Sequence, residues 1–119
     1  MTEFNLIERV ADWNITRDNL LYSPSLEYSM LDEELDEYME AGQKSDKVNE
    51  ADALADLVWV ALGGLTKLCN GDKDKVKAIM RAVADANDTK SEEKNDKGKI
   101  TKPKDFVEPQ AAIESILRW

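Results

Sequence analysis

Two groups of carboxylates carry the clearest chemical signal in this sequence. The first is Glu33-Glu34-Leu35-Asp36-Glu37, and the second is Asp52 with Asp56, which leads directly into the apolar run 57–62. Carboxylates three or four residues apart lie on one face of a helix, where like charges repel unless a cation lies between them. Magnesium prefers carboxylate oxygens as ligands. We therefore expect two packed helices that hold Mg²⁺ and act on a phosphate compound.

Helical spacing divides the acids of the first group between two faces. Glu34 and Glu37 share a face with apolar side chains, because they are linked to them by steps of three and four residues. Asp32, Asp36 and Glu40 fall on another face, which is typical of a solvated acidic surface. The first face is therefore the one on which we expect metal ligands.

The second group continues into a segment that we expect to be buried. Asp52 and Asp56 share a helix face, and no further charge occurs before Lys67, so Asp56 is expected close to the core. The alternative is that acids favour the positive end of a helix dipole, which suits Glu50 and Asp52 at the helix start. It does not suit the mid-helix acids of the first group. Spacing alone leaves both a metal site and a solvated acidic face open.

Charge is distributed unevenly along the 119 residues, whose formal net charge is −9. Residues 27–56 contain eleven acids and two lysines, whereas residues 90–104 contain six lysines and three acids, a net charge of +3. The overall negative charge argues against a nucleic-acid partner and against binding to anionic membranes. An acidic site combined with a basic segment suits a metal ion and a polyphosphate.

Composition excludes several other classes of chemistry. The sequence has no histidine, which excludes histidine-based catalysis and most zinc enzymes. Cys69 is the single cysteine, so no intrachain disulfide can form. The N-terminal residues do not resemble a signal peptide, and the apolar run 57–65 is too short to span a bilayer. We expect a cytoplasmic protein.

Apolar periodicity predicts an all-α fold in one domain, residues 1–119. The spacing of apolar residues, proline and glycine predicts four main helices over residues 3–13, 24–44, 47–69 and 74–88, and a short terminal helix over 110–117. Residues 14–23 and the lysine-rich segment 89–103 are expected to be loops. The pair Gly63-Gly64 lowers helix propensity within a buried segment, so we interpret it as a point of close helix approach.

The acidic pattern resembles that of the MazG-like all-α nucleotide pyrophosphohydrolases, which carry EExxE on one helix and ExxD on the next. The resemblance extends over most of the chain from residue 24. Within the family, the sequence is most similar in type to the small bacterial and phage members. The segments that carry it are Glu33-Glu34-x-x-Glu37, Asp52–Gly63, Val83–Lys90, Gly98–Pro103 and Phe106–Pro109. It implies a four-helix MazG-like bundle and an enzyme of nucleotide metabolism.

One position departs from the family pattern. The glutamate of ExxD would stand three residues before Asp56, where this sequence has Ala53. Asp52 is one residue earlier and still shares the face of Asp56, so it can replace that ligand. Glu50 is a weaker replacement, because it stands six residues before Asp56 and therefore lies on a different helix face. The identity of the missing ligand stays open between these two acids.

The resemblance implies a Mg²⁺-dependent reaction, with Mn²⁺ as an alternative metal. Members cleave a nucleoside triphosphate between the α and β phosphates, giving monophosphate and pyrophosphate. The implied metal ligands are Glu34, Glu37, Asp52 and Asp56. Because histidine is absent, a carboxylate must accept the proton of the attacking water, and we choose Glu34, with Glu33 second. The base and sugar preference stay open.

The resemblance also implies residues that bind the substrate. Asn87 and Lys90 would contact the phosphates, and Lys99 and Lys102 are weaker candidates in a loop whose charges can simply be solvated. Trp59 follows Asp56 by one turn, so it stacks either on the base or within the core. Within the class, phosphoribosyl-ATP hydrolysis is an alternative substrate. Outside it, the alternative is a non-catalytic acidic helical protein that binds a partner or sequesters a nucleotide.

The helix predicted over 47–69 is apolar on nearly every side from residue 57 to residue 65. Such a helix needs packing partners all round, which a chain of this length offers only in part. The resemblance implies a homodimer, or a tetramer formed by its doubling. We expect the helices of two chains to form a shared bundle.

Overall fold

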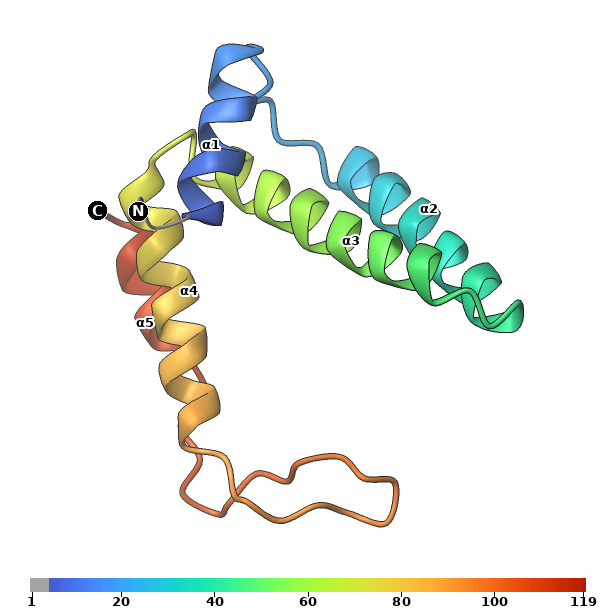
Figure 1. Ribbon diagram of the computed structural model, residues 1–119. Coiled ribbons are helices and arrows are strands. Elements are labelled where there is room, and N and C mark those ends of the chain that lie inside the picture. The colour runs from blue at the N-terminus through green and yellow to red at the C-terminus, as the bar shows by residue number, and fades with distance from the viewer. Residues whose placement is uncertain (1–4) are drawn as a thin grey trace, which may run out of the picture. The chain divides into compact units, whose positions relative to one another are not determined.

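The computed structural model describes residues 5–119, and these form five α-helices and no strand (Figure 1). The all-α class is confirmed. The chain divides into two compact units, one ending at Lys73 and one beginning at Asp74. The helices are α1 (Leu6–Thr16), α2 (Pro24–Gln43), α3 (Lys47–Leu68), α4 (Lys73–Asp88) and α5 (Gln110–Leu117). The predicted start of the first helix, residues 3 and 4, lies outside the described residues.

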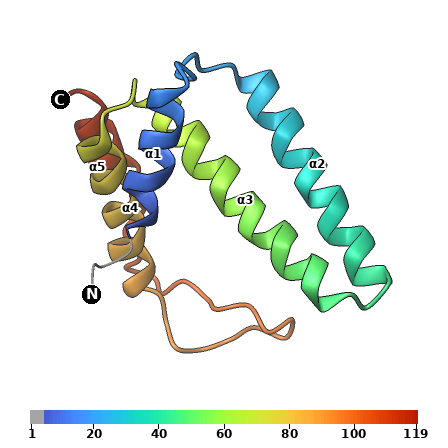
Figure 2. The ribbon, with the colours of Figure 1, turned by 45° about the horizontal axis from the view of Figure 1, so that its top comes forward.

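The first unit is built on a hairpin of α2 and α3, with α1 packed on α3 (Figure 2). Small side chains bring these helices close together, since the buried positions include Ala11, Ala41 and Ala53. The glycine pair has the predicted role, because a Cβ at Gly63 would lie 3.4 Å from Asn14 Nδ2 on α1. A Cβ at Gly64 would lie 2.9 Å from Glu27 Oε2 on α2, which is too close for van der Waals contact.

The first helix continues three residues beyond its predicted end, to Thr16. Asparagine usually favours turns because its side chain competes with the backbone for hydrogen bonds. Here Asn14 is buried, and its Nδ2 donates to the carbonyl of Val10 at 2.9 Å, one turn back. Asn19 Nδ2 donates to Asn14 Oδ1 at 2.7 Å. The side chain is thus satisfied within the helix and at its end, which allows α1 to extend.

Sequence signals at the helix ends of α2 and α3 are confirmed. Ser23 is the N-cap of α2 and Pro24 occupies its first position, as predicted. After α3, Asn70 and Gly71 have positive φ angles of 55° and 79°. A Cβ at Gly71 would also lie 3.1 Å from Leu20 Cδ1, so both backbone conformation and space favour glycine there.

The second unit contains α4, α5 and the lysine-rich segment between them. Both helices line a common groove, and the segment 89–109 contains no helix. An isolated antiparallel bridge pairs Lys94 with Ile100, and the Ser91 and Thr101 hydroxyl oxygens are 2.6 Å apart. The segment is therefore an irregular hairpin. No helix among the described residues is long and apolar enough to cross a membrane.

Candidate metal and nucleotide site

Three carboxylates from facing helices converge within the first unit. Glu34 and Glu37 come from the middle of α2, and Asp56 comes from α3. One carboxylate oxygen from each residue lies within 4.8 Å of the other two. We call Glu34, Glu37 and Asp56 the acidic cluster. Its members are three of the four predicted metal ligands.

The Glu34 carboxyl group has a strongly raised pKa. Burial raises its pKa from the ordinary value of 4.5 to about 7, and a hydrogen bond between its protonated form and Glu37 adds to the shift. The negative charges of Asp56, Glu37 and Glu33 raise it further. Glu34 Oε2 is buried without a hydrogen-bond partner in the described part of the chain. Burial and like charges both penalise the ionised form of this group.

A divalent cation fits this arrangement. A buried carboxylate oxygen without a partner is costly unless a cation or a proton compensates it. The donor set is made entirely of carboxylate oxygens, which are the ligands that hard cations take. The residues present therefore have the chemistry of a divalent-metal site.

The raised pKa of Glu34 predicts how the stability of the metal-free protein depends on pH. Between pH 4.5 and about 7 the unfolded chain loses the Glu34 proton while the folded chain keeps it. The native state then binds more protons, so the contribution of Glu34 to the free energy of unfolding falls as pH rises through this window. Urea unfolding in EDTA at several pH values measures it.

Glu34→Gln is the control for this pH effect, because glutamine does not titrate. The free energy of unfolding of wild type minus that of Glu34→Gln should decrease as pH rises from 4.5 to 7. A difference that is constant across this range would show that the Glu34 carboxyl group titrates normally.

The structure places the other predicted acids around the cluster and not in it. Asp52 is exposed and lines, with Glu37, a cavity of about 260 Å³ near the turn between α2 and α3. Glu33 is exposed, and its charge acts on Glu34. Ala53 is 2% exposed, so the family glutamate at this position would lie between the helices.

A second cavity begins one helical turn from the acidic cluster on both α2 and α3. Met30 precedes Glu34 by four residues and Trp59 follows Asp56 by three, and both line this cavity of about 160 Å³. Its other lining residues include Trp13, Asn14, Asn19, Glu27 and Lys67. We call it the tryptophan cavity.

Two aromatic rings form one wall of the tryptophan cavity. The Trp13 and Trp59 rings meet edge to face, with centroids 5.7 Å apart and an interplanar angle of 82°. The Arg17 guanidinium lies 4.4 Å from the Trp13 centroid, in a cation–π contact. Trp59 is half-buried. It therefore packs against α1 and also faces the cavity, so the two sequence interpretations of this residue are compatible.

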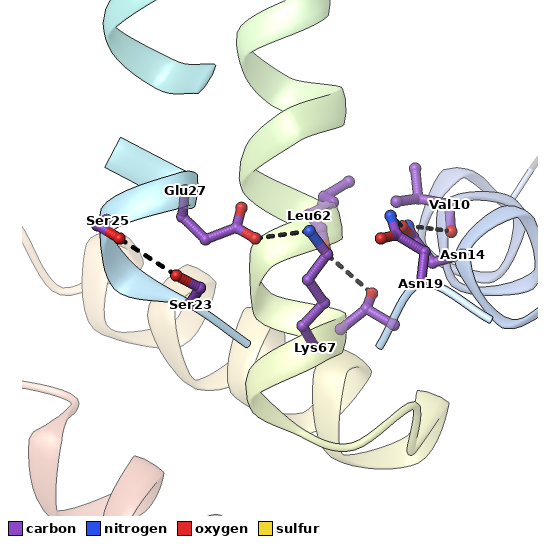
Figure 3. A network of polar contacts seen from close by, with 9 residues as sticks. Val10, Asn14, Asn19, Ser23, Ser25, Glu27, Leu62 and Lys67 are labelled. Atoms are coloured by element: carbon purple, nitrogen blue, oxygen red, sulfur yellow. Dashed lines mark hydrogen bonds and ion pairs between the residues drawn. The ribbon is translucent and has the colours of Figure 1, made fainter. Parts of the chain in front are cut away.

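Sequence reasoning missed a buried ion pair at the same cavity. Lys67 Nζ donates to Glu27 Oε1 at 2.7 Å, and the two residues are 4% and 7% exposed (Figure 3). Figure 3 shows the pair between the first turns of α2 and the last turns of α3. Forty residues separate the partners, so no local spacing rule could have connected them. The one sequence signal was a lysine inside an otherwise apolar run.

The second unit brings together three of the predicted phosphate-binding residues. Asn87, Lys90 and Lys102 line a cavity of about 150 Å³ around Phe106. The two ammonium groups lie 6.0 Å and 5.0 Å from the Phe106 centroid, and Lys102 Nζ donates to Glu108 at 2.8 Å. We call this group the lysine pocket. The predicted Lys99 is exposed and is not among its lining residues.

An all-α fold with clustered carboxylates on facing helices is the arrangement expected of a metal-dependent enzyme that acts on a phosphate compound. Comparison with known families is more specific, since the model described as phosphoribosyl-ATP pyrophosphohydrolase matches residues 13–87. The chain therefore belongs to this family, within the MazG-like all-α superfamily of nucleoside triphosphate pyrophosphohydrolases. A search of curated proteins found no match. The matched range contains the acidic cluster and the tryptophan cavity.

Family membership decides between the enzyme and the non-catalytic alternative. The family is one of pyrophosphohydrolases, which are hydrolases acting on acid anhydrides. The chain is thus a nucleotide pyrophosphohydrolase of the MazG-like class.

Proposed function

We propose that the protein is a Mg²⁺-dependent enzyme that hydrolyses a ribo- or deoxyribonucleoside triphosphate to the monophosphate and pyrophosphate. The observation that carries this proposal is the acidic cluster, with its partnerless Glu34 oxygen, in a chain of a pyrophosphohydrolase family. We propose Glu34, Glu37 and Asp56 as metal ligands, with Asp52 completing the set. The bound metal would orient the phosphates and lower the pKa of the attacking water.

Within this proposal Glu34 is the group that accepts a proton. The chain has no histidine, so a carboxylate must take this role, and Glu34 is the half-buried glutamate of the acidic cluster. The exposed Glu33 remains the second choice, because it is the neighbouring carboxylate with access to solvent.

We propose the tryptophan cavity as the place of the base, and the lysine pocket as a contributor to phosphate binding. Trp59 offers an aromatic ring one turn from Asp56 on the same helix. Asn87, Lys90 and Lys102 offer an amide and two ammonium groups. Ammonium groups can neutralise those phosphate charges that a metal ion leaves uncovered.

A nucleotide screen tests the proposed function. The protein is incubated with each common ribo- and deoxyribonucleoside triphosphate and Mg²⁺, and pyrophosphate is measured. We expect release from at least one of them, abolished by EDTA and restored by Mg²⁺ or Mn²⁺. Metal-independent release, or none with any nucleotide, would contradict the proposal.

Phosphoribosyl-ATP is the second candidate substrate. The description of the matching family model names phosphoribosyl-ATP pyrophosphohydrolase. Among nucleotides other than the common triphosphates of the screen, phosphoribosyl-ATP is therefore the favoured candidate. The same pyrophosphate assay with phosphoribosyl-ATP separates the two candidates. A much higher kcat/KM for this compound than for any triphosphate in the screen would assign it as the substrate.

An exposed apolar stripe along the hairpin supports a homodimer, or a tetramer of two dimers. On α3, residues 54, 58, 61, 65 and 68 follow steps of three and four, and Val58 is 49% exposed. On α2, Tyr28 and Leu35 are also exposed. This periodicity is typical of helices that pack against other helices. We propose that a second copy covers the stripe and completes a four-helix bundle.

Charge introduced into this stripe should separate the subunits. Val58→Glu would place a carboxylate against an apolar partner surface, so we expect light scattering at micromolar concentration to change from a dimer or tetramer mass to a monomer mass. Leu21→Glu is the control, because Leu21 is 85% exposed outside the stripe. A wild-type protein that is already a monomer would refute the homodimer.

Removal of lysine-pocket side chains should weaken nucleotide binding and leave metal binding intact. We expect Lys90→Ala and Asn87→Ala to lower the affinity for a nonhydrolysable triphosphate by about tenfold, the usual size for a hydrogen bond to a charged group. Lys102→Ala should have a smaller effect that fades with salt, because its charge is exposed and already paired with Glu108.

Calorimetric titration measures these affinities, and Lys99→Ala is the matched control from the same segment. Its side chain lies outside the lysine pocket, so its effect should be the smallest and should also fade with salt. Unchanged affinity in both Lys90→Ala and Asn87→Ala would remove this segment from substrate binding.

A further inference from the structure

Burial of the Glu27–Lys67 ion pair has a desolvation cost, so a role besides joining two helices would explain its presence. Removing two charges from water costs several kcal/mol per ion, and apolar residues of similar volume often stabilise a protein as well or better. The chain also leaves Gly64 without a side chain, since a Cβ there would lie 2.9 Å from Glu27 Oε2. Glycine at position 64 lowers helix propensity, but it leaves space for the Glu27 carboxylate.

The pair has hydrogen-bonding capacity that the described residues do not fill. A lysine ammonium carries three donors, and the hydrogen bond to Glu27 uses one of them. The Glu27 carboxylate accepts this bond through Oε1 and has further lone pairs. Both residues line the tryptophan cavity. A strong donor and a strong acceptor therefore stand side by side at a cavity, shielded from bulk water.

The position of the pair relates it to the acidic cluster. Along α2, the residues Glu27, Met30 and Glu34 follow steps of three and four, so they share one face. On α3, the residues Asp56, Trp59, Gly63 and Lys67 do the same. The acidic cluster, the aromatic wall and the ion pair thus follow one another along the same faces of α2 and α3. A ligand held by its phosphates at one end would reach the pair with its other end.

We infer that Glu27 and Lys67 recognise the polar edge of the substrate's heterocyclic base, an inference that rests on the proposed function. Lys67 donates to a carbonyl oxygen or ring nitrogen of the base, and Glu27 accepts from an adjacent N–H. The tryptophan rings supply the apolar contact for the ring faces. Sites that hydrogen-bond a substrate reject analogues without the matching groups, because buried polar groups are then left unpaired. The pair is thus a determinant of base specificity.

The test uses the double variant Glu27→Gln/Lys67→Met, which keeps side-chain size and removes both charges together. Single variants leave one buried charge unpaired and can unfold the protein. The control is Glu114→Gln/Arg118→Met, which removes an exposed pair at the C-terminal end of α5. Thermal unfolding with and without Mg²⁺ establishes that each variant is folded and that the acidic cluster still responds to metal.

Two measurements are made on wild type and both variants. The first is the ratio of kcat/KM between the best and the worst nucleotide of the screen, and the second is calorimetric binding of the corresponding nucleosides, which lack phosphate. We expect the double variant to reduce this ratio and the affinity for the preferred nucleoside by about tenfold or more, and the control to change neither.

The outcomes separate this inference from the proposed function. Equal loss of kcat/KM for every nucleotide, with unchanged nucleoside affinity, would make the pair purely structural and overturn the inference. A wild-type enzyme that neither binds nucleosides nor ranks bases would overturn it as well, while its pyrophosphate release would leave the proposed function standing. Nucleoside binding that depends on the pair in a protein without hydrolysis would support the inference and contradict the function.

Discussion

Glu37→Gln and Asp56→Asn should each abolish pyrophosphate release and the rise in melting temperature that Mg²⁺ produces. Each removes one of three carboxylates that converge within 4.8 Å. Substitution of residues that merely support metal ligands costs about ten- to hundredfold, so loss of a ligand should reduce kcat/KM by at least about a hundredfold. The thermal effect follows from linkage, because a ligand that binds only the folded state stabilises it.

The melting temperatures of the same variants without metal provide an independent test of the acidic cluster. Without a cation, the three carboxylates of the cluster repel one another, so removing one negative charge should leave the melting temperature in EDTA unchanged or higher. Asp36→Asn is the matched control, because Asp36 is an exposed acid of the same helix on another face. If both cluster variants keep the full response to Mg²⁺, the metal site lies elsewhere.

Lys67→Met should destabilise the protein by about 3–5 kcal/mol, the usual cost of leaving a buried charge without its partner. Lys67 is 4% exposed and its partner Glu27 is 7% exposed, so solvent cannot replace the lost ion pair. The double variant Glu27→Gln/Lys67→Met should recover most of this loss, because no charge then remains buried. Urea unfolding of wild type, both single variants and the double variant gives the coupling free energy.

The exposed Glu114–Arg118 pair provides the reference for this cycle. Its N–O distance of 2.6 Å is as short as that of the buried pair, but both side chains are largely exposed. Arg118→Met should therefore cost less than about 1 kcal/mol. A Lys67→Met cost of the same size as Arg118→Met would show that water reaches the Glu27 carboxylate and that the pair is not a buried one.

The helix ends that sequence predicted well are those with strong local signals. Pro24 begins α2 at its predicted residue, and the predicted end of α3 at residue 69 differs from the observed end at Leu68 by one residue. The end of α1 was missed by three residues, because Asn14 finds its hydrogen-bond partners in the preceding turn and at Asn19. A turn-forming residue predicts a loop only when its side chain lacks such partners.

The acidic cluster was accessible to sequence because helical periodicity places acids on faces. Glu34, Glu37 and Asp56 were selected by spacing, and the packing of α2 on α3 brings them together. Asp52 was selected by the same rule, but it is exposed and is not one of the three residues whose carboxylate oxygens converge. Contacts between distant residues, such as the bond of Lys67 to Glu27, depend on how the helices pair, which no spacing rule contains.

We propose that this chain cleaves a nucleotide between the α and β phosphates, with the metal held by the acidic cluster. Phosphorus NMR of the preferred nucleotide, incubated with protein and Mg²⁺, measures it most directly. We predict monophosphate and pyrophosphate in equal amounts, with neither formed in EDTA or by Asp56→Asn. Formation of a diphosphate and orthophosphate would rule out cleavage between the α and β phosphates, and equal product from Asp56→Asn and wild type would rule out the acidic cluster as the metal site.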